Sequence, residues 1–202
     1  MSTEVNYYEN FEKIEKKIWS MLSEAITNRN SSFRVPVFIC GSQSNFDGRV
    51  VVLRKADKIN QIVQFHTDIR SDKIKNLKNN KNAAMIFYDK VEKIQIRVKV
   101  NCIINHNNKV TKESWLQTQH ISRKCYLVSN GPGTESSIPT SGLNSELDNF
   151  KFTKEQSEKG YINFAVIQCK IKSIEWLYLA AKGHRRALLN FTGNKKKSWL
   201  VP

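Results

Sequence analysis

The sequence contains few of the features that define several broad classes of protein. Its 202 residues include only four cysteines, which lie far apart with no Cys-x-x-Cys pair, so no disulfide framework is indicated. No apolar run approaches the roughly 18 to 20 residues that a membrane span requires, and the first residues are polar and acidic, unlike an export signal. We therefore expect a cytoplasmic protein without a membrane segment, with buried, reduced thiols at Cys40, Cys102, Cys125 and Cys169.

Motifs of the common enzyme classes are also missing. The sequence has no Gly-rich loop of the dinucleotide or P-loop type, no His-Glu-x-x-His, no Gly-x-Ser-x-Gly and no Cys/His cluster at zinc spacing. It thus gives no support to metal-dependent or triad hydrolysis. We expect no metal site, and the sequence assigns no catalytic residue.

Positive charge is abundant. Lys and Arg number 33 against 18 Asp and Glu, a net charge of +15, which is typical of proteins that bind polyanions. Most of the excess is lysine spread along the chain among asparagines, however, and the basic runs lack interleaved aromatic residues. We expect a solvated basic surface and do not expect nucleic acid to be the main partner.

The hydropathy pattern changes period once along the chain. Phe11, Ile14, Ile18, Leu22 and Ala25 recur at steps of three and four, which predicts an amphipathic helix over Tyr8–Ile26. Segments rich in Val, Ile and Phe then predict strands at Phe33–Cys40, Arg49–Arg54, Gln61–His66, Ala83–Tyr88, Ile94–Ile104, Phe164–Leu179 and Arg185–Phe191. Short helices are expected at Ser71–Asn80 and within Lys109–Ser122.

The connections indicate the fold class. Asn45–Gly48 ends in Asp-Gly, and Asp57 and Lys58 separate the next two strands; both predict tight hairpin turns. Residues 129–147 are rich in Gly, Pro and Ser and predict a long surface loop. About seven strands joined mostly by hairpins, with two or three helices, predict a mainly β (α+β) antiparallel barrel or sandwich. We expect a single domain over residues 1–202, with its first helix within 1–30.

Polar residues gather where the third predicted strand passes into the next helix. Thr67, Arg70, Ser71 and Lys73 lie at this junction, where free backbone N–H groups and the helix dipole favour an anion. Cationic side chains beside hydroxyls suit a phosphate monoester. The alternative is that these residues cap the helix and carry surface charge.

Several segments together resemble a known family. RVVVLR, FHTDIRSDK, NNKNAAMIFYD and QIRVKV, followed by HRRA and a terminal WLVP, are similar in order and spacing to the pyridoxamine 5'-phosphate oxidase-related proteins, which bind FMN. The similarity runs from about Phe33 to Pro202 and is weakest between Asn105 and Asn163. It implies a six-stranded antiparallel Greek-key split β-barrel that forms a homodimer, with FMN in the grooves between subunits.

The resemblance also implies roles for individual residues. Arg49, Thr67, Ser71 and Lys73 would hold the flavin phosphate, with Arg70 as a further cation beside Asp72, which stands where the oxidase has an Arg. Residues 50–54 would line the flavin ring, His66 would lie against the cofactor, and Gln95 would hydrogen-bond the ring edge or ribityl chain. The cofactor-binding set is Arg49, Val50, Val51, Val52, Leu53, Arg54, His66, Thr67, Arg70, Ser71, Lys73 and Gln95.

The implied activity is hydride transfer from an amine or another small substrate to the flavin. The residues expected to contact that substrate are Arg54, Arg123, Tyr126, His184, Arg185 and Arg186. Two alternatives stay open: an FMN-binding reductase, carrier or sensor that does not turn over pyridoxamine phosphate, and a basic nucleic-acid-binding barrel without flavin. Among the aromatic residues, Trp176, Tyr178, Tyr88 and Trp199 are expected to pack.

Overall fold

An antiparallel sheet dominates the computed structural model, which describes residues 7–42, 45–143, 147 and 153–202. Nine strands lie in this part of the chain: β1 (Val37–Ser42), β2 (Asn45–Val50), β3 (Leu53–Asp57), β4 (Ile62–Asp68), β5 (Asn82–Asp89), β6 (Ile94–His106), β7 (Phe164–Tyr178), β8 (Arg185–Asn190) and β9 (Lys197–Leu200). Their order is β2-β1-β5-β6-β7-β4-β3, with β8 paired to β7 and β9 paired to β8. The predicted mainly β antiparallel class is confirmed, although β9 was not predicted.

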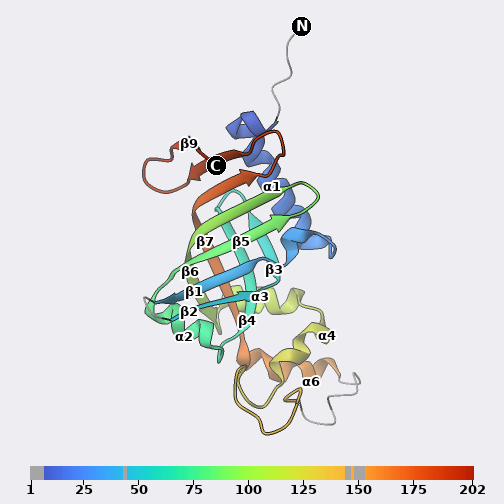
Figure 1. The fold of residues 1–202 in the computed structure, drawn as a ribbon. Coiled ribbons are helices and arrows are strands. Elements are labelled where there is room, and N and C mark those ends of the chain that lie inside the picture. The colour runs from blue at the N-terminus through green and yellow to red at the C-terminus, as the bar shows by residue number, and fades with distance from the viewer. Residues whose placement is uncertain (1–6, 43–44, 144–146, 148–152) are drawn as a thin grey trace.

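The long strands β6 and β7 form the centre of the sheet (Figure 1). On β6 the side chains alternate, so that Ile94, Ile96 and Val98 are buried while Arg97 and Lys99 face outward. This alternation follows from the period of two in an extended chain. On β7, which pairs with β6, β4 and β8, Trp176 is fully buried, as expected.

Helix α1 (Phe11–Thr27) closes one side of the core and confirms the predicted N-terminal helix. Asn10 caps its first turn, because the Asn10 side chain accepts a hydrogen bond from the Lys13 backbone N–H at 2.9 Å. Ile14, Ile18 and Leu22 are fully buried on one face, and the helix packs against β3. Burial of that face is what holds the helix on the barrel.

The segment from Phe33 to Arg54 differs from the prediction of two simple strands. Phe33 lies in a 3-10 turn, η2 (Ser32–Arg34), and β1 begins only at Val37, after Pro36, which has no N–H to donate to a sheet. The predicted strand Arg49–Arg54 is in fact two strands, since β2 ends at Val50 and β3 begins at Leu53. The reason is tertiary: β2 pairs with β1 at one end of the sheet order and β3 pairs with β4 at the other.

The two predicted hairpin turns had different outcomes. The Asn45–Gly48 turn was wrong, because this segment belongs to β2, with Asp47 opposite Cys40 and Gly48 opposite Ile39; residues 43–44, between β1 and β2, are outside the described residues. The turn after β3 is confirmed, with Asn60 donating backbone and side-chain hydrogen bonds to the Asp57 carboxylate at 2.9 and 3.0 Å.

The remaining helices gather at the end of the barrel opposite the C-terminus (Figure 1). In chain order they are α2 (Asp72–Asn79), α3 (Lys109–Gln117), α4 (His120–Arg123), η3 (Lys124–Tyr126), α6 (Lys154–Glu158) and η4 (Lys159–Asn163). The predicted helices at 71–80 and 109–122 are therefore confirmed, and α6 was not foreseen. Here Trp115, Tyr126, Phe164 and Val166 form a second, smaller core.

The long loop, the four cysteines and two of the aromatic side chains were also predicted from the sequence. Residues 129–143 form no helix or strand, as predicted, while 144–146 and 148–152 are outside the described residues. Cys40, Cys102 and Cys169 are buried as expected, but Cys125 is exposed, so the prediction of four buried thiols was wrong. Trp199 is 45% exposed and stacks on Phe11 with ring centroids 4.4 Å apart, and Tyr88 projects outward from β5.

Candidate functional site

Three buried polar side chains meet where β4 passes into α2. The Lys73 Nζ lies 2.8 Å from Thr67 Oγ1 and 3.1 Å from Ser71 Oγ, and the two hydroxyl oxygens are 3.3 Å apart. All three residues are buried, with Ser71 only 1% exposed. The structure thus brings together three of the four residues that the resemblance assigns to a phosphate, at the amino end of a helix.

The Lys73 ammonium is electrostatically unsatisfied in this position. Burial, and then the positive charge of Arg49, lower its pKa from 10.5 to about 8. The two carboxylates that act on Lys73 pair with other residues, because Asp68 forms an ion pair with Arg70 at 2.7 Å and Asp72 with Lys75 at 2.8 Å. A bound anion would offset both causes of the shift.

Arg49 supplies a second cation beside this group. It stands on β2 opposite Phe38 and forms an ion pair with Asp47. Its Nε is nevertheless buried without a hydrogen-bond partner in the described part of the protein. A buried N–H that lacks an acceptor costs free energy, and a phosphate oxygen would supply that acceptor. The residues present therefore fit a phosphate group.

The valine-rich segment after Arg49 divides between three environments. Val50 is 62% exposed on the outer face of the sheet, whereas Val51 and Leu53 are buried in the core. Val52 and Arg54 instead line a cavity of about 900 Å³. These residues do not share the alternating faces of one strand, because the chain leaves β2 at Val50 and enters β3 at Leu53.

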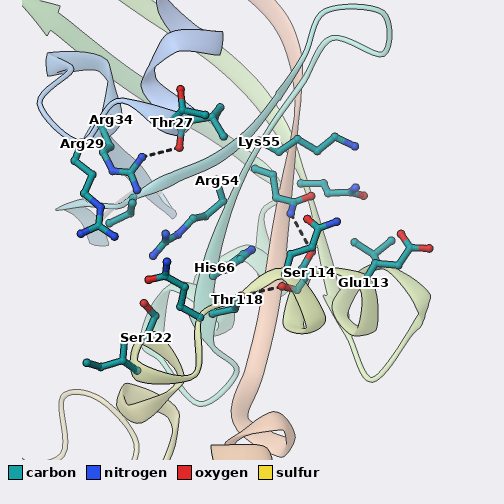
Figure 2. A pocket seen from close by; sticks show the side chains of 18 residues that line it. Thr27, Arg29, Arg34, Arg54, Lys55, His66, Glu113, Ser114, Thr118 and Ser122 are labelled. Carbon is teal, nitrogen blue, oxygen red and sulfur yellow. Dashed lines mark hydrogen bonds between the residues drawn. The ribbon is translucent and has the colours of Figure 1, made fainter. Parts of the chain in front are cut away.

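The cavity lies between the carboxyl end of α1, strands β3 and β4, and helices α3 and α4 (Figure 2). Its lining residues are Ile26, Thr27, Arg29, Arg34, Val52, Arg54, Lys55, Gln64, His66, Val110, Glu113, Ser114, Gln117, Thr118, Gln119, Ile121, Ser122 and Gln168. Four of them are cationic and one, Glu113, is acidic. The cavity is therefore suited to an anionic ligand.

His66 is held neutral inside this cavity. Burial, together with the positive charge of Arg54, lowers the His66 pKa from 6.5 to about 3, and the ring packs edge-on against Phe164 with centroids 4.8 Å apart. A neutral imidazole offers one hydrogen-bond donor and one acceptor at neutral pH. His66 and Arg54 therefore present a polar but singly charged surface to a ligand.

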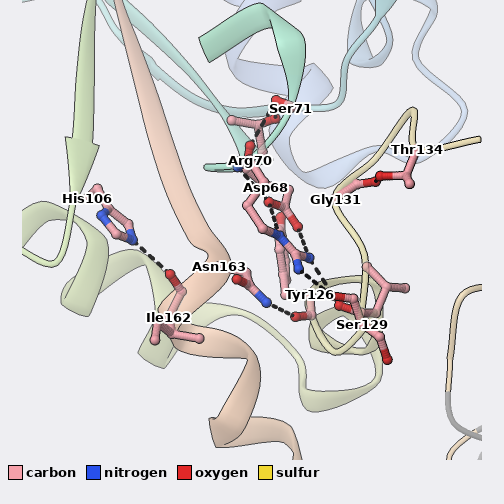
Figure 3. Close-up of polar contacts among 12 residues, drawn as sticks. Asp68, Arg70, Ser71, His106, Tyr126, Ser129, Gly131, Thr134, Ile162 and Asn163 are labelled. Atoms are coloured by element: carbon pink, nitrogen blue, oxygen red, sulfur yellow. Dashed lines mark hydrogen bonds and ion pairs between the residues drawn. The ribbon is translucent and has the colours of Figure 1, made fainter. Parts of the chain in front are cut away.

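Arg70 is occupied by other groups. Its guanidinium binds the Asp68 carboxylate through Nε at 3.0 Å and Nη2 at 2.7 Å, and donates to the Val128 and Ser129 carbonyls at 3.1 and 3.0 Å (Figure 3). The structure thus places Arg70 where it fastens the start of the 129–143 loop to the β4–α2 junction. Nothing in the described contacts directs it toward Lys73.

Arg123 and Tyr126, expected to contact a substrate, lie in the second core. Arg123 is 3% exposed, donates to Glu158 at 2.5 Å and to the Trp115 carbonyl at 2.6 Å, and stacks over the Trp115 ring. Tyr126 is buried against Trp115 and Phe164, and burial raises the pKa of its hydroxyl. Neither residue lines the cavity.

Four further predicted residues lie at the opposite end of the barrel. On β6, Gln95 lies opposite Leu177 of β7, and Asn105 lies opposite Val166 of β7. His66 on β4 also lies opposite Val166, so His66 is level with Asn105 and not with Gln95. Gln95 and Asn105 are ten residues apart on β6, which corresponds to roughly 33 Å. His184 is exposed before β8, Arg185 forms an ion pair with Glu9 at 3.7 Å, and Arg186 binds Glu175 at 2.7 Å. Within one chain, these residues do not meet Lys73.

Sequence reasoning did not select two groups that the structure places in the cavity. Gln64 on β4 donates to Ser114 Oγ on α3 at 3.2 Å, which joins two cavity walls. Arg29 and Arg34, at the end of α1, line the same cavity. Arg29 and Arg34 lie only five residues apart shortly after a helix, and this spacing was a local signal in the sequence. Their approach to Arg54, however, depends on the packing of α1 against β3.

Comparison with known proteins gives one family. Residues 17–106 match the protein-family model described as the pyridoxamine 5'-phosphate oxidase FMN-binding domain. Over these residues, the chain is similar to the pyridoxamine 5'-phosphate oxidase-related FMN-binding proteins. No protein with a curated description matches the chain in sequence. The domain that this model describes binds FMN.

Solved structures share the fold of this chain at low sequence identity. A pyridoxamine 5'-phosphate oxidase-related, FMN-binding protein from Nostoc punctiforme is 15% identical with a TM-score of 0.72, over 96% of this chain and 98% of that one. PhzG from Burkholderia lata, solved with tetrahydrophenazine-1-carboxylic acid, is 14% identical with a TM-score of 0.73, over 100% and 99%. These likenesses confirm the predicted split-barrel fold.

Two negative observations apply to the described residues of this chain. They contain no group of three or more His, Cys, Asp or Glu side chains arranged to hold a metal ion. Within the same residues, no helix has the length and apolar character needed to cross a membrane.

Proposed function

We propose that this protein binds FMN and acts as an FMN-dependent oxidoreductase on a small anionic substrate. The observation that carries the proposal is the buried Lys73 ammonium, which contacts Thr67 and Ser71 and has no carboxylate partner among the described residues. Arg49, with its buried and unpaired Nε, completes a set of donors suited to the terminal phosphate of FMN. The family relationship supports the choice of flavin over other phosphate esters.

FMN, when bound, supplies the hydride chemistry. The protein's own residues bind and orient the flavin and the substrate. Arg54 faces the cavity beside His66, so that it attracts an anionic substrate, while the neutral imidazole gives a hydrogen bond without adding charge. Gln64 and Ser114, hydrogen-bonded to one another, fix the opposite wall.

The proposed site is completed by a second copy of the chain. Gln95, Arg185 and Arg186 lie too far along the barrel to reach a flavin held by Lys73 of the same chain, so they would serve the partner's site. An apolar strip on the outer face supports such a dimer: Val37 is 37% and Val50 62% exposed, and Val37 lies opposite both Val50 and Ile86. Exposed apolar patches of this kind mark interaction surfaces.

A flavoprotein that does not turn over pyridoxamine phosphate is the second candidate. The observation that favours it is the placement of Arg123 and Tyr126, which are used to build the second core and do not line the cavity. Their loss from the substrate set removes two expected contacts. Such a protein would be a reductase, a carrier or a sensor of flavin.

The proposal is tested by comparing FMN with riboflavin, which has the same ring and no phosphate. We expect the purified protein to bind FMN at least about a hundredfold more tightly, as expected for loss of several charge-assisted hydrogen bonds. Equal affinity would refute the phosphate site, and binding of neither would refute the flavin assignment. Anaerobic addition of pyridoxamine phosphate then separates the two candidates: a bleached flavin band supports the oxidase, and an unchanged band supports the second candidate.

A further inference from the structure

We propose that the cavity beside Arg54 binds a substrate with two anionic groups, the second of which is held by Arg29 and Arg34. This inference rests on the proposed function, since it names the substrate class for the same site. The ligand would be a small molecule with an apolar body and, for example, two carboxylates.

The first observation concerns how arginine is used in this protein. The sequence has nine arginines, and six of them form ion pairs with carboxylates: Arg49, Arg70, Arg97, Arg123, Arg185 and Arg186. The other three are Arg29, Arg34 and Arg54, which form no such pair within the described residues. All three line the one cavity. The arginines without a carboxylate partner among the described residues are thus all found in this cavity.

The second observation is the arrangement of these three side chains. Figure 2 shows Arg29, Arg34 and Arg54 together on one side of the cavity, while Lys55 and Glu113 lie on the other. Arg54 is half-buried near His66. The pKa of Arg54 is lowered by burial and then by the positive charge of Arg34, with a further contribution from Arg29. The three guanidinium groups therefore repel one another, and an anion bound between them would offset this repulsion.

Arg34 is fixed in position before any ligand binds. One of its terminal nitrogens donates to the Ala25 and Ile26 carbonyls at 2.9 and 2.8 Å, which anchors the side chain at the carboxyl end of α1. Arg29 is exposed at the same end of the helix. The remaining N–H groups of both side chains are available to one anionic group, in the two-pronged geometry that arginine favours.

The size of the charge cluster indicates more than one anion. A monoanion at Arg54 would leave the charges of Arg29 and Arg34 uncompensated in the same cavity. Apolar surface from Ile26, Val52 and Ile121 is part of the lining, which suits the body of a ligand that carries an anionic group at each side. We therefore assign Arg54 to one anionic group and the Arg29 and Arg34 pair to the other.

The test uses the FMN-loaded protein and three rigid probes: benzoate, benzene-1,3-dicarboxylate and benzene-1,4-dicarboxylate. Calorimetry and the flavin difference spectrum report their binding. At least one dicarboxylate is expected to bind at least about tenfold more tightly than benzoate, and Arg29→Gln is expected to remove most of that advantage while leaving benzoate affinity unchanged. Arg29 is exposed and makes no described ion pair, so this variant should fold normally.

Lys58→Gln is the matched control, because it removes one exposed positive charge from a turn outside the cavity. It should keep the dicarboxylate advantage. Equal binding of the three probes to the unaltered protein, or an advantage that persists in Arg29→Gln, would overturn the inference. Failure of the proposed function is recognised separately, as absence of FMN binding, and calorimetry on the flavin-free protein still measures the preference for two anionic groups.

Discussion

The Lys73 Nζ lies 2.8 Å from the Thr67 hydroxyl although both residues are buried and no carboxylate in the described part of the chain forms an ion pair with the ammonium. A lysine in such a position is costly in an empty site and favourable in a site that holds a phosphate. This relationship gives the cofactor proposal its most direct tests.

Removal of either proposed phosphate contact should weaken FMN binding. Lys73→Ala and Arg49→Ala are each expected to raise the dissociation constant for FMN at least about tenfold, about 1.4 kcal/mol, because each removes a charge-assisted hydrogen bond. Fluorescence quenching of FMN measures both. Lys75→Ala is the control, since Lys75 is an exposed lysine of the same helix that pairs with Asp72. Unchanged FMN affinity in both test variants would disprove the pocket.

FMN affinity should also decrease as the pH rises above about 8. In the flavin-free protein the Lys73 pKa is lowered to about 8, so above that pH binding of the phosphate must be accompanied by uptake of a proton. Linkage then predicts a loss of up to about tenfold in affinity per pH unit. Titrations between pH 7 and 9.5 measure this slope, and Lys73→Ala should abolish it. Riboflavin, which has no phosphate, should show no such slope.

The same shift predicts the opposite trend for the stability of the flavin-free protein. Because the folded pKa of Lys73 lies below the unfolded value near 10.5, the unfolded chain binds more protons between these two values. The Lys73 contribution to the free energy of unfolding therefore rises with pH from about 8 to about 10.5. The difference between the unaltered protein and Lys73→Met in denaturant titrations isolates this contribution, and a difference independent of pH would contradict the burial argument.

Arg123→Ala should destabilise the fold. The side chain is 3% exposed and joins Glu158, the Trp115 ring and two backbone carbonyls, so its removal should lower the free energy of unfolding by about 2 to 4 kcal/mol. Urea denaturation measures the loss. Lys112→Ala, an exposed change on the neighbouring α3, should have little effect. A fully stable Arg123→Ala protein with impaired substrate binding would restore the role that the resemblance implied.

Val50→Glu should separate the proposed dimer. Val50 is 62% exposed beside Val37 on the outer face of the sheet, and a carboxylate in an apolar interface is strongly unfavourable. Size-exclusion chromatography with light scattering should show a dimer for the unaltered protein and a monomer for the variant. Ile59→Glu provides the control, because Ile59 is 93% exposed in the turn after β3. A monomeric unaltered protein would contradict the two-chain site.

The local pattern of the sequence determined much of the framework. The spacing of Ile14, Ile18 and Leu22 predicts α1, and the alternation along Ile94–Val100 predicts the centre of β6, because helix and strand periods are properties of the local backbone. Thr67, Ser71 and Lys73 were also within reach of the sequence, since they lie within seven residues at one strand-to-helix junction and short-range geometry brings them together.

Tertiary packing decided what the sequence left undetermined. Val50 to Arg54 reads as one strand, but pairing with β1 at one side and β4 at the other breaks it and sends Arg49 and Arg54 to different surroundings. Arg123 and Arg70 read as ligand-binding cations, yet the carboxylates of Glu158 and Asp68 engage them. Arg29, Arg34 and Arg54 meet only because α1 packs on β3. Contacts between residues distant in the chain, whose energies depend on burial and on the charges nearby, carry no signature in local periodicity.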